Sequence, residues 1–408
     1  MLRGKDIVCV SSLDWDAMWT SKQQIMRRLA KANRVLYVEE PVTMLAPLKV
    51  PGRIKRWGAI VPRLRKSAES EVWILTPPPL LPFGNMRPGL NRANQAILAR
   101  YIRWAMKRLE FAEDAILWAY LPTAVALLDR FAERKRRDGP QRPGWPGLVV
   151  YHCVDEHSAF PGFVSPDVVA GYDNELTRRA DLVITTSENL RRSRETLNPH
   201  TYTVVNAADV ELFNRALDPA VPVPADLAAI PIPRLAVVGL HDSRLDVAAL
   251  EELAKADPAW QIVLIGPVKA GQVDEGLLRG YPNIHLLGEK PRAELPGYLK
   301  GVSVALIPYK TNALTQNIFP LKLFEYLAAG VPVVVGGLPE LGKFQGVISV
   351  AESPRDYPRL VQEEMSRDGQ TARAERIALA GENTWEHRVE EISLLVEEAL
   401  RRRAAGGQ

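Results

Sequence analysis

The sequence has few cysteines, and none of its apolar runs is long. Only two of its 408 residues are cysteine, which excludes a disulfide scaffold. Cys9 and Cys153 each lie within an apolar run, so we predict buried thiols in a reducing compartment. No run approaches the ~20 apolar residues of a membrane-spanning helix. With 47% hydrophobic and 25% charged residues, the composition also excludes disordered, collagenous and mainly membrane-embedded chains.

Clustered metal ligands are also lacking. The six histidines are scattered, and no close Cys/His cluster or Asp-x-Asp pair is present. We therefore expect neither a metal nor another cofactor. The apolar run near the N-terminus ends at Ser11-Ser12 and is too short for a signal peptide, so we expect a cytoplasmic protein, peripheral on the inner face of the cell membrane.

Charge is distributed unevenly along the chain. Residues 1–200 contain 31 Lys/Arg and 21 Asp/Glu, whereas residues 201–408 contain 21 and 27, for an overall net charge of +4. The N-terminal half is therefore expected to face an anionic partner.

Short apolar runs alternate with helical patterns along most of the chain. This alternation indicates βαβ units and a doubly wound parallel sheet, and Ser21 with Gln24 predicts a capping box at the first helix. The predicted strands of the first half are Asp6–Ser11, Arg34–Val38, Val72–Leu75, Ala115–Ala119, Leu148–Cys153, Leu182–Thr186 and Tyr202–Val205. Those of the second half are Leu235–Val238, Gln261–Ile265, Ile284–Leu287, Val304–Ile307 and Val331–Val335.

A proline-rich stretch separates the two halves. We predict an N-terminal domain over 1–213, a linker over 214–233, a second domain over 234–380 and a C-terminal helical segment over 381–408. Within the last segment, Thr384–Leu400 has apolar residues at helical spacing.

The segment Pro320–Val334 contains the most informative pattern. It predicts a helix that stops at Gly330 and leads into a buried strand, with Lys322 and Glu325 on one helix face. A lysine near a helix start can hold a diphosphate, and a carboxylate one turn later can accept hydrogen bonds from ribose. On spacing alone, a surface ion pair between the two residues is the favoured interpretation.

Several blocks together resemble a known family. Pro282–Gly288, Leu295–Leu299, Ala305–Tyr309 and Pro320–Val334 resemble the donor half of a bacterial GT-B glycosyltransferase, close to family 4. Ser11–Asp16, Gln23-Gln24, Val35–Glu39 and Ala180–Ser187 are similar to the N-terminal half of the enzymes of capsule, teichuronic-acid and xanthan-type pathways.

The resemblance implies two Rossmann-like domains with a deep cleft between them, and a C-terminal helix that crosses back to the first domain. The acceptor would bind the first domain and the nucleotide sugar the second. The implied donor-binding residues are Gly239, Arg244, Gly288, Glu289, Tyr309, Leu321, Lys322 and Glu325.

Two departures from the family pattern bear on the mechanism. Asn317 stands where retaining relatives carry a second acid, and Gly239 is not followed by the usual phosphate-gripping Arg and Lys. An inverting transfer requires a general base, and we favour Asp155, which follows a predicted strand, over His157 and Glu156. A capping or turn role for Asp155 is the alternative.

The segment Leu48–Ala68 has seven Lys/Arg, no acid and interleaved apolar residues. This composition is typical of a segment that lies on an anionic membrane surface; a solvated loop is the alternative, and no nucleic-acid-binding motif is present. Trp15, Trp19 and Gln24, together with His157, are the predicted acceptor contacts, although the tryptophans fit helix packing equally well.

These observations predict a metal-independent glycosyltransferase of the hexosyltransferase type, with a UDP-sugar favoured as donor. The acceptor would be a lipid-linked molecule or a polysaccharide, and no nucleic acid would bind. Two alternatives are a sugar-nucleotide 2-epimerase of the same fold and a catalytically silent sugar-nucleotide-binding partner of a polysaccharide assembly complex.

Overall fold

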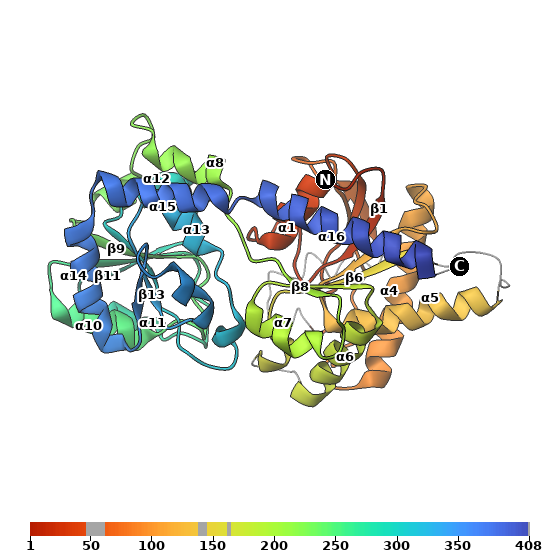
Figure 1. The fold of residues 1–408 in the computed structure, drawn as a ribbon. Helices are drawn as coiled ribbons and strands as arrows, with labels where there is room; N and C mark the ends of the chain where they lie inside the picture. The colour runs from red at the N-terminus through yellow and green to blue at the C-terminus, as the bar shows by residue number, and fades with distance from the viewer. Residues whose placement is uncertain (46–61, 138–144, 161–164, 407–408) are drawn as a thin grey trace. The chain divides into compact units, whose positions relative to one another are not determined.

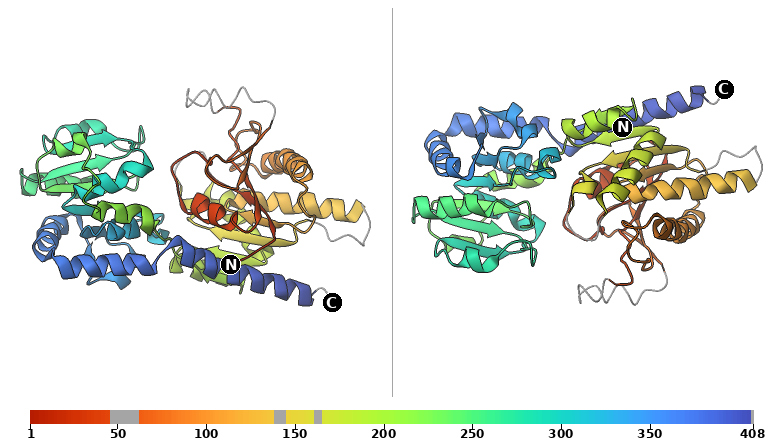
Figure 2. Two further views of the ribbon diagram at one scale, coloured as in Figure 1. Left: turned by 90° about the horizontal axis from the view of Figure 1, so that it is seen from above. Right: turned by 90° about the horizontal axis from the view of Figure 1, so that it is seen from below.

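The computed structural model describes residues 1–45, 62–137, 145–160 and 165–406, shown as coloured ribbons in Figure 1. The chain folds into two compact units. One comprises Met1–Val205 with Arg388–Gln408, and the other comprises Asn206–His387. In each unit, helices lie on both faces of a central sheet (Figures 1 and 2).

The first unit contains an eight-stranded sheet in the order β3-β4-β2-β1-β5-β6-β7-β8. All neighbouring strands pair in parallel except β3 and β4. The central strands are fully buried, which agrees with their unbroken apolar sequences. The strands are β1 (Asp6–Val10), β2 (Arg34–Val38), β3 (Arg63–Lys66), β4 (Trp73–Thr76), β5 (Ile116–Ala119), β6 (Leu148–Cys153), β7 (Leu182–Thr185) and β8 (Thr201–Thr203).

The helices of the first unit connect these strands. The apolar faces of α4, α5 and α6 enter the main core beside β1, β5 and β6. The helices are α1 (Ser21–Leu29), α4 (Pro88–Arg108), α5 (Val125–Arg137), α6 (Pro166–Arg179) and α7 (Glu188–Glu195), with the short helices η2 (Pro122–Ala124) and η3 (His157–Ala159).

The second unit contains a six-stranded parallel sheet in the order β11-β10-β9-β12-β13-β14. In order of sequence this is the 3-2-1-4-5-6 arrangement of dinucleotide-binding folds. The strands are β9 (Arg234–Val238), β10 (Gln261–Ile265), β11 (Ile284–Gly288), β12 (Val304–Ile307), β13 (Val333–Gly336) and β14 (Ser349–Ala351).

Short helices occupy the crossovers of the second sheet. The longer helices α10 and α14 pack against its core. The helices are α8 (Val210–Phe213), α9 (Ala225–Ala228), α10 (Val247–Ala256), α11 (Glu275–Arg279), α12 (Leu295–Lys300), α13 (Lys322–Ala328), α14 (Tyr357–Arg367) and α15 (Gln370–Glu382), with the short helices η4 (Asn214–Leu217) and η6 (Thr315–Asn317).

The last helix, α16 (Trp385–Gly406), shows the predicted amphipathic spacing, since Val389, Ile392, Val396 and Ala399 are all buried. Within the first unit, the Arg388 guanidinium donates to the Val205 carbonyl at 3.0 Å. Residues 388–408 thus belong to the first unit. No helix in the described part of the chain is both long enough and apolar enough to cross a bilayer.

Residues 214–233 were predicted to form a linker without regular elements, and this prediction is wrong. The segment contains η4 and α9 and lies within the second unit. The Lys300 ammonium of α12 donates to three backbone carbonyls of the segment, at 2.7, 3.1 and 2.7 Å. The prolines prevent a long helix here, but they do not prevent packing against α12.

Two local details also differ from the sequence prediction. The capping box of α1 is formed by Thr20 with Gln23, one residue earlier than Ser21 with Gln24. Strands β3 and β14 were not predicted, because Arg-Leu-Arg-Lys lacks the apolar pattern of a buried strand and Ser-Val-Ala is too short to show one.

Gly266, which follows β10, provides a test of how tightly the second sheet is packed. A Cβ added there would lie 1.9 Å from the Gly239 carbonyl oxygen, and the residue has a φ of +144°. We expect Gly266→Ala to lower the free energy of unfolding of the second unit by about 3 kcal/mol. The matched control Gly271→Ala also has positive φ (+75°) but no neighbour within 4 Å, and should cost about 1 kcal/mol. Urea denaturation of both variants measures the difference, and equal losses would contradict the packing argument.

Candidate functional site

Three adjacent strands of the second sheet end at glycines in the left-handed region. Gly239, Gly266 and Gly288 have φ of +118°, +144° and +72°. The Gly239 amide donates to the Ile265 carbonyl at 2.7 Å, and the Gly266 amide to the Gly288 carbonyl at 2.8 Å. At these three strand ends, the carboxyl edge of the sheet therefore presents backbone atoms without side chains, which allows close approach of a ligand.

Lys322 lies directly against the first of these glycines. A Cβ added at Gly239 would lie 2.2 Å from Lys322 Cε and 2.3 Å from Nζ. In the described part of the chain, no hydrogen bond or salt bridge engages this ammonium group. Strand order reverses between β9 and β12, and ligands of open α/β sheets bind at this point.

The position of Lys322 depends on how α13 is fixed. The Tyr326 hydroxyl, one turn further along, accepts a hydrogen bond from the Val238 amide at 3.0 Å. The helix ends as predicted at Gly330, whose φ is +73°, and the Val331 amide donates to the Tyr326 carbonyl at 3.1 Å. Helix α13 starts at Lys322, so Pro320 precedes the helix instead of occupying its first turn.

Glu325 lies one helical turn after Lys322, as predicted. Burial raises the pKa of this carboxyl from 4.5 to about 6, while the nearby Lys322 and Arg292 oppose the increase. Arg292 itself forms an ion pair with Asp209 at 2.9 Å. Lys322 therefore offers an ammonium group that has no hydrogen-bonded partner in the described part of the chain. Glu325 offers a half-buried carboxyl group that can accept hydrogen bonds when ionised.

Arg244, a predicted phosphate contact, is already paired. Its guanidinium donates two hydrogen bonds of 2.8 Å to Asp242, and it lies 5.5 Å from the centre of the Tyr309 ring. Although burial opposes the effect, these hydrogen bonds hold the pKa of Asp242 below its usual range. The structure thus places Arg244 and Tyr309 next to each other, with the arginine charge neutralised by Asp242.

His241 is a residue of this site that the sequence prediction missed. The side chain is buried, and its Nε2 has no hydrogen-bond partner within the described residues. Burial, together with the charge of Lys322, lowers the pKa of His241 to about 4, so the imidazole is neutral at pH 7. No sequence pattern marks this histidine, because its proximity to Lys322 arises only in the folded unit.

The remaining predicted donor residues differ in exposure. Glu289 is exposed beyond the end of β11, whereas Leu321 is half-buried and immediately precedes α13. Asn317 lies in η6 and donates a hydrogen bond to the Ala313 carbonyl at 2.8 Å.

In the first unit, Asp155 lies two residues after β6, at the carboxyl edge of that sheet. Its neighbour Glu156 is paired with Arg194 at 2.8 Å, and this hydrogen bond lowers the pKa of Glu156 although burial opposes it. His152 is fully buried in β6, and burial lowers its pKa to about 3, as expected for a core residue. Burial also lowers the pKa of His157. The Asp155 carboxylate thus remains available to act on a substrate, while the Glu156 carboxylate is held by Arg194.

Lys22 of α1 was not predicted to belong to this site. It is only 5% exposed, and its ammonium group lies 5.4 Å from the centre of the Tyr120 ring. Burial lowers the pKa of Lys22, and the charge of Asp155 opposes this decrease. The charges of Lys22 and Asp155 thus interact at the carboxyl edge of the first sheet.

Two of the predicted acceptor contacts are core residues. Trp15 is 3% exposed, and its indole N–H donates to the Ser67 hydroxyl at 3.2 Å. Gln24 is also 3% exposed, and its side-chain oxygen accepts from Arg28 at 2.6 Å. Trp19 is half-buried, edge-on to Trp15. Burial and the hydrogen bond of its indole N–H favour the packing interpretation of Trp15.

The predicted membrane segment Leu48–Ala68 lies mostly outside the described residues, which resume at position 62. In the described part, Arg65 pairs with Asp16 and Lys66 with Glu71, both at 2.5 Å. Two of the seven basic residues are therefore paired with acids. Among the described residues, no group of three His, Cys, Asp or Glu side chains is arranged to hold a metal ion.

Comparison with known proteins agrees with this geometry. Residues 239–362 match the family described as glycosyl transferases group 1. Over 223 residues the chain is 29% identical to TuaH of Bacillus subtilis, described as a teichuronic acid biosynthesis glycosyltransferase. This match covers 50% of the chain and 56% of TuaH, so the chain spans about half the length of this curated relative.

Solved structures show the fold of the whole chain. The trehalose 6-phosphate synthase of Burkholderia multivorans matches with a TM-score of 0.67 at 14% identity, over 100% of both chains. The HepE protein of Anabaena, solved in complex with UDP, matches with a TM-score of 0.64 at 15% identity, over 97% of this chain and 100% of that one. The chain therefore has the predicted GT-B fold of two parallel-sheet α/β domains.

The raised pKa of Glu325 predicts a pH-dependent effect on stability. Because the folded pKa (about 6) lies above the unfolded value, ionisation of Glu325 destabilises the fold progressively from about pH 4.5 to 6 and fully above pH 6. Glu325→Gln should therefore raise the free energy of unfolding by about 1 to 2 kcal/mol at pH 8, with little change at pH 4. Urea denaturation at both pH values measures the effect. The exposed control Glu289→Gln should change stability at neither pH. A gain in the free energy of unfolding of Glu325→Gln at pH 4 alone would contradict the raised pKa of Glu325.

Proposed function

We propose that the chain is a glycosyltransferase that transfers a sugar from a nucleoside-diphosphate sugar, with a UDP-sugar favoured. The observation that carries this proposal is the unpaired Lys322 ammonium against the bare backbone of Gly239, inside a group 1 glycosyltransferase domain. The UDP bound in the HepE structure supports the choice of nucleotide. The acceptor would be a lipid-linked molecule or a polysaccharide, which is the chemistry suggested by the description of TuaH.

On this proposal, the second unit binds the leaving diphosphate. Lys322 Nζ lies at the strand ends, where the absence of a side chain at Gly239 lets a phosphate approach the backbone and the ammonium group closely. A fixed cation stabilises the negative charge that develops on the diphosphate as the bond to the sugar breaks. Glu325, when ionised, would accept hydrogen bonds from ribose or sugar hydroxyls. Lys322 would thus neutralise part of the charge of the leaving diphosphate, and we propose that the reaction requires no metal.

For the chemical step we propose inversion of configuration with Asp155 as general base. The Asp155 carboxylate would take the proton of the acceptor hydroxyl as its oxygen attacks the anomeric carbon. The bond from that carbon to the diphosphate breaks, and the nucleoside diphosphate leaves with the electron pair. Asn317, which cannot ionise, in place of the second acid of retaining relatives supports this choice.

We further propose that the protein works in the cytoplasm against the inner face of the membrane, through the basic segment Leu48–Ala68. The composition of residues 48–61, which lie outside the described part of the chain, is the support for this placement.

Lys322→Ala tests the donor site. Loss of a charge-assisted contact to the diphosphate should weaken UDP binding about 10- to 100-fold, because such a hydrogen bond contributes about 1.5 to 3 kcal/mol. Calorimetric titration with UDP, with and without EDTA, measures the affinity. The exposed control Lys255→Ala should bind UDP like the parent protein. Unchanged affinity of Lys322→Ala, or no binding of any nucleoside diphosphate by the parent, would refute the donor site.

Asp155→Asn tests the chemical step separately. Removal of a general base should slow transfer about a hundredfold or more, with donor affinity unchanged. Incorporation of radiolabelled sugar from the donor into glycolipid or polymer measures transfer, with exposed Asp167→Asn as the control. Full activity of Asp155→Asn would eliminate this residue as the base. A parent protein that binds donor but never transfers sugar would identify a silent binding partner instead.

A further inference from the structure

Helix α4 is amphipathic, with one face buried and the opposite face exposed. On the buried face, Leu98, Ile102 and Ala105 belong to the main core of the first unit. On the opposite face, Ile97 is 36% exposed and Trp104 is 43% exposed. These two residues are seven positions apart, close to two helical turns, so their side chains emerge on the same side of the helix. Helix α4 thus presents two large apolar side chains on the surface of the first unit.

All charged residues of α4 are basic. Arg92, Arg100, Lys107 and Arg108 lie exposed on the same side of the helix as the two apolar residues. Within the described part of the chain, none of these four side chains forms a hydrogen bond or an ion pair. No Asp or Glu occurs over residues 72–109. A helix face that meets only water usually mixes charges of both signs, so the single sign of this face indicates an anionic partner.

The order of residues along the exposed face is typical of a helix at a membrane interface. Ile97, Arg100, Trp104 and Lys107 follow one another at spacings of three and four, which place them in a single row. In interfacial helices, apolar side chains enter the boundary of the acyl chains, while Lys and Arg reach the lipid phosphates. Tryptophan is enriched at this boundary because its ring is apolar and its N–H is polar. The row therefore combines the two kinds of side chain that an anionic bilayer binds.

Helix α4 covers the face of the first sheet to which the end of the predicted membrane segment also turns. Leu64 of β3 and Tyr101 of α4 both pack against the core on that face. Strand β3 contains three of the seven basic residues of the segment, and two of the three are paired with acids. The four exposed cations of α4 have no such partner in the described part of the chain. This surface therefore gives evidence of its own, independent of the composition of residues 48–61.

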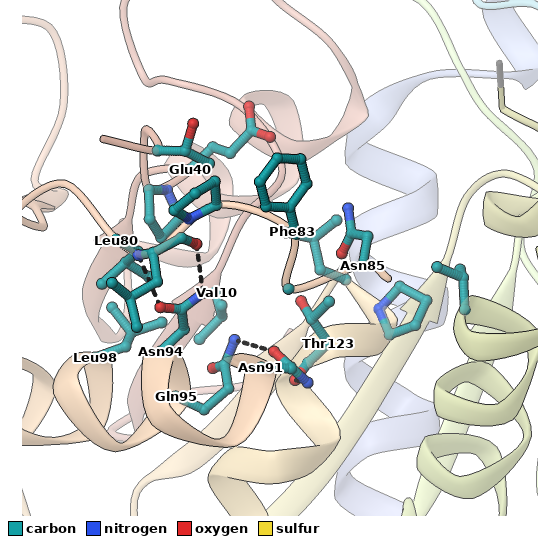
Figure 3. A pocket seen from close by; sticks show the side chains of 18 of the residues that line it. Val10, Glu40, Leu80, Phe83, Asn85, Asn91, Asn94, Gln95, Leu98 and Thr123 are labelled. Carbon is teal, nitrogen blue, oxygen red and sulfur yellow. Dashed lines mark hydrogen bonds between the residues drawn. The ribbon is translucent and has the colours of Figure 1, made fainter. Parts of the chain in front are cut away.

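The buried face of α4 reaches the carboxyl edge of the first sheet. There Asn91 and Gln95 line a pocket of about 440 Å³, with Phe83 on its opposite side (Figure 3). His157, two residues after Asp155, also lines this pocket. The first turns of α4 therefore lie between the pocket and the exposed face of the helix. A bilayer along the exposed face would lie beside the carboxyl edge and leave that edge open.

We propose that the exposed face of α4 binds the surface of an anionic bilayer. Ile97 and Trp104 enter the boundary of the acyl chains, and the four exposed cations bind the lipid phosphates. The proposed function uses Leu48–Ala68 as the membrane contact, and α4 adds a second contact that fixes which side of the first unit faces the bilayer. On the proposed function, on which this last step rests, a lipid-linked acceptor reaches the carboxyl edge by diffusion within the bilayer.

Sedimentation of the full chain with lipid vesicles tests the proposal. Vesicles of phosphatidylcholine mixed with phosphatidylglycerol should bind the protein about tenfold or more tightly than vesicles of phosphatidylcholine alone. The double variant Arg100→Gln/Lys107→Gln should bind the mixed vesicles about tenfold more weakly, because both cations contact the lipid phosphates. The control Lys255→Gln/Arg355→Gln removes two exposed cations of the second unit, and this variant should bind like the parent protein.

Trp104→Ala separates insertion into the interface from attraction between charges. Loss of the ring should weaken binding to the mixed vesicles about threefold or more. The melting temperature and the UDP affinity should stay unchanged, since the side chain is exposed. The matched control Leu394→Ala removes an apolar side chain that is 64% exposed on α16, and this variant should bind like the parent protein. Unchanged binding of Trp104→Ala would overturn the insertion of α4.

Two further outcomes would overturn the proposal. One is full binding of the Arg100→Gln/Lys107→Gln variant to the mixed vesicles, since the membrane contact would then lie elsewhere. The other is displacement of the protein from the vesicles by duplex DNA at equal phosphate concentration, since α4 would then be a nucleic-acid contact. The result is independent of the donor experiment: vesicle binding with no UDP affinity would refute the proposed function alone, and UDP affinity with no vesicle binding would refute this inference alone.

Discussion

The close contact between Lys322 and Gly239 is the constraint on which the donor site depends. Any side chain at position 239 would occupy the place of the lysine ammonium group. Gly266, on the neighbouring strand, is equally restricted, because its own backbone lies against the Gly239 carbonyl. A cation can therefore lie at the strand ends only because these residues lack a Cβ, and the hydrogen bond between Tyr326 and Val238 keeps the helix that carries it in register.

The two units use the carboxyl edges of their sheets in different ways. In the second unit the edge is bare backbone with an unpaired lysine, which suits a diphosphate. In the first unit the edge carries side-chain amides, an aromatic ring and carboxylates. Lys22 lies beneath this surface at 5% exposure, and its charge acts on Asp155 instead of being presented to solvent. The two sheets thus present different side-chain chemistry at the same edge of the same fold.

Burial and ion pairing within the protein decide which charged residues remain available to contact a ligand. Arg244 was predicted to contact phosphate, yet its guanidinium is neutralised by Asp242 two residues earlier. Glu156, one residue after Asp155, is held by Arg194. Lys322 and Asp155 differ from these residues because, within the described part of the chain, neither is engaged by a hydrogen-bonded partner of opposite charge. Sequence patterns identify charged residues, but local pairing determines which of them can meet a ligand.

The sequence by itself determined the buried apolar strands, the parallel α/β class and the helix stop at Gly330, because apolar periodicity and glycine conformation are local properties. It did not reveal the short strands β3 and β14 at the sheet edges. It also determined Lys322 and Glu325 as a pair, since their spacing fixes them on one helix face. Only the tertiary structure showed that residues 214–233 pack on α12, that Trp15 is buried, and that the pocket is lined by Phe83 and Gln95. These features arise where segments distant in sequence meet, and no local pattern encodes which side chains meet there.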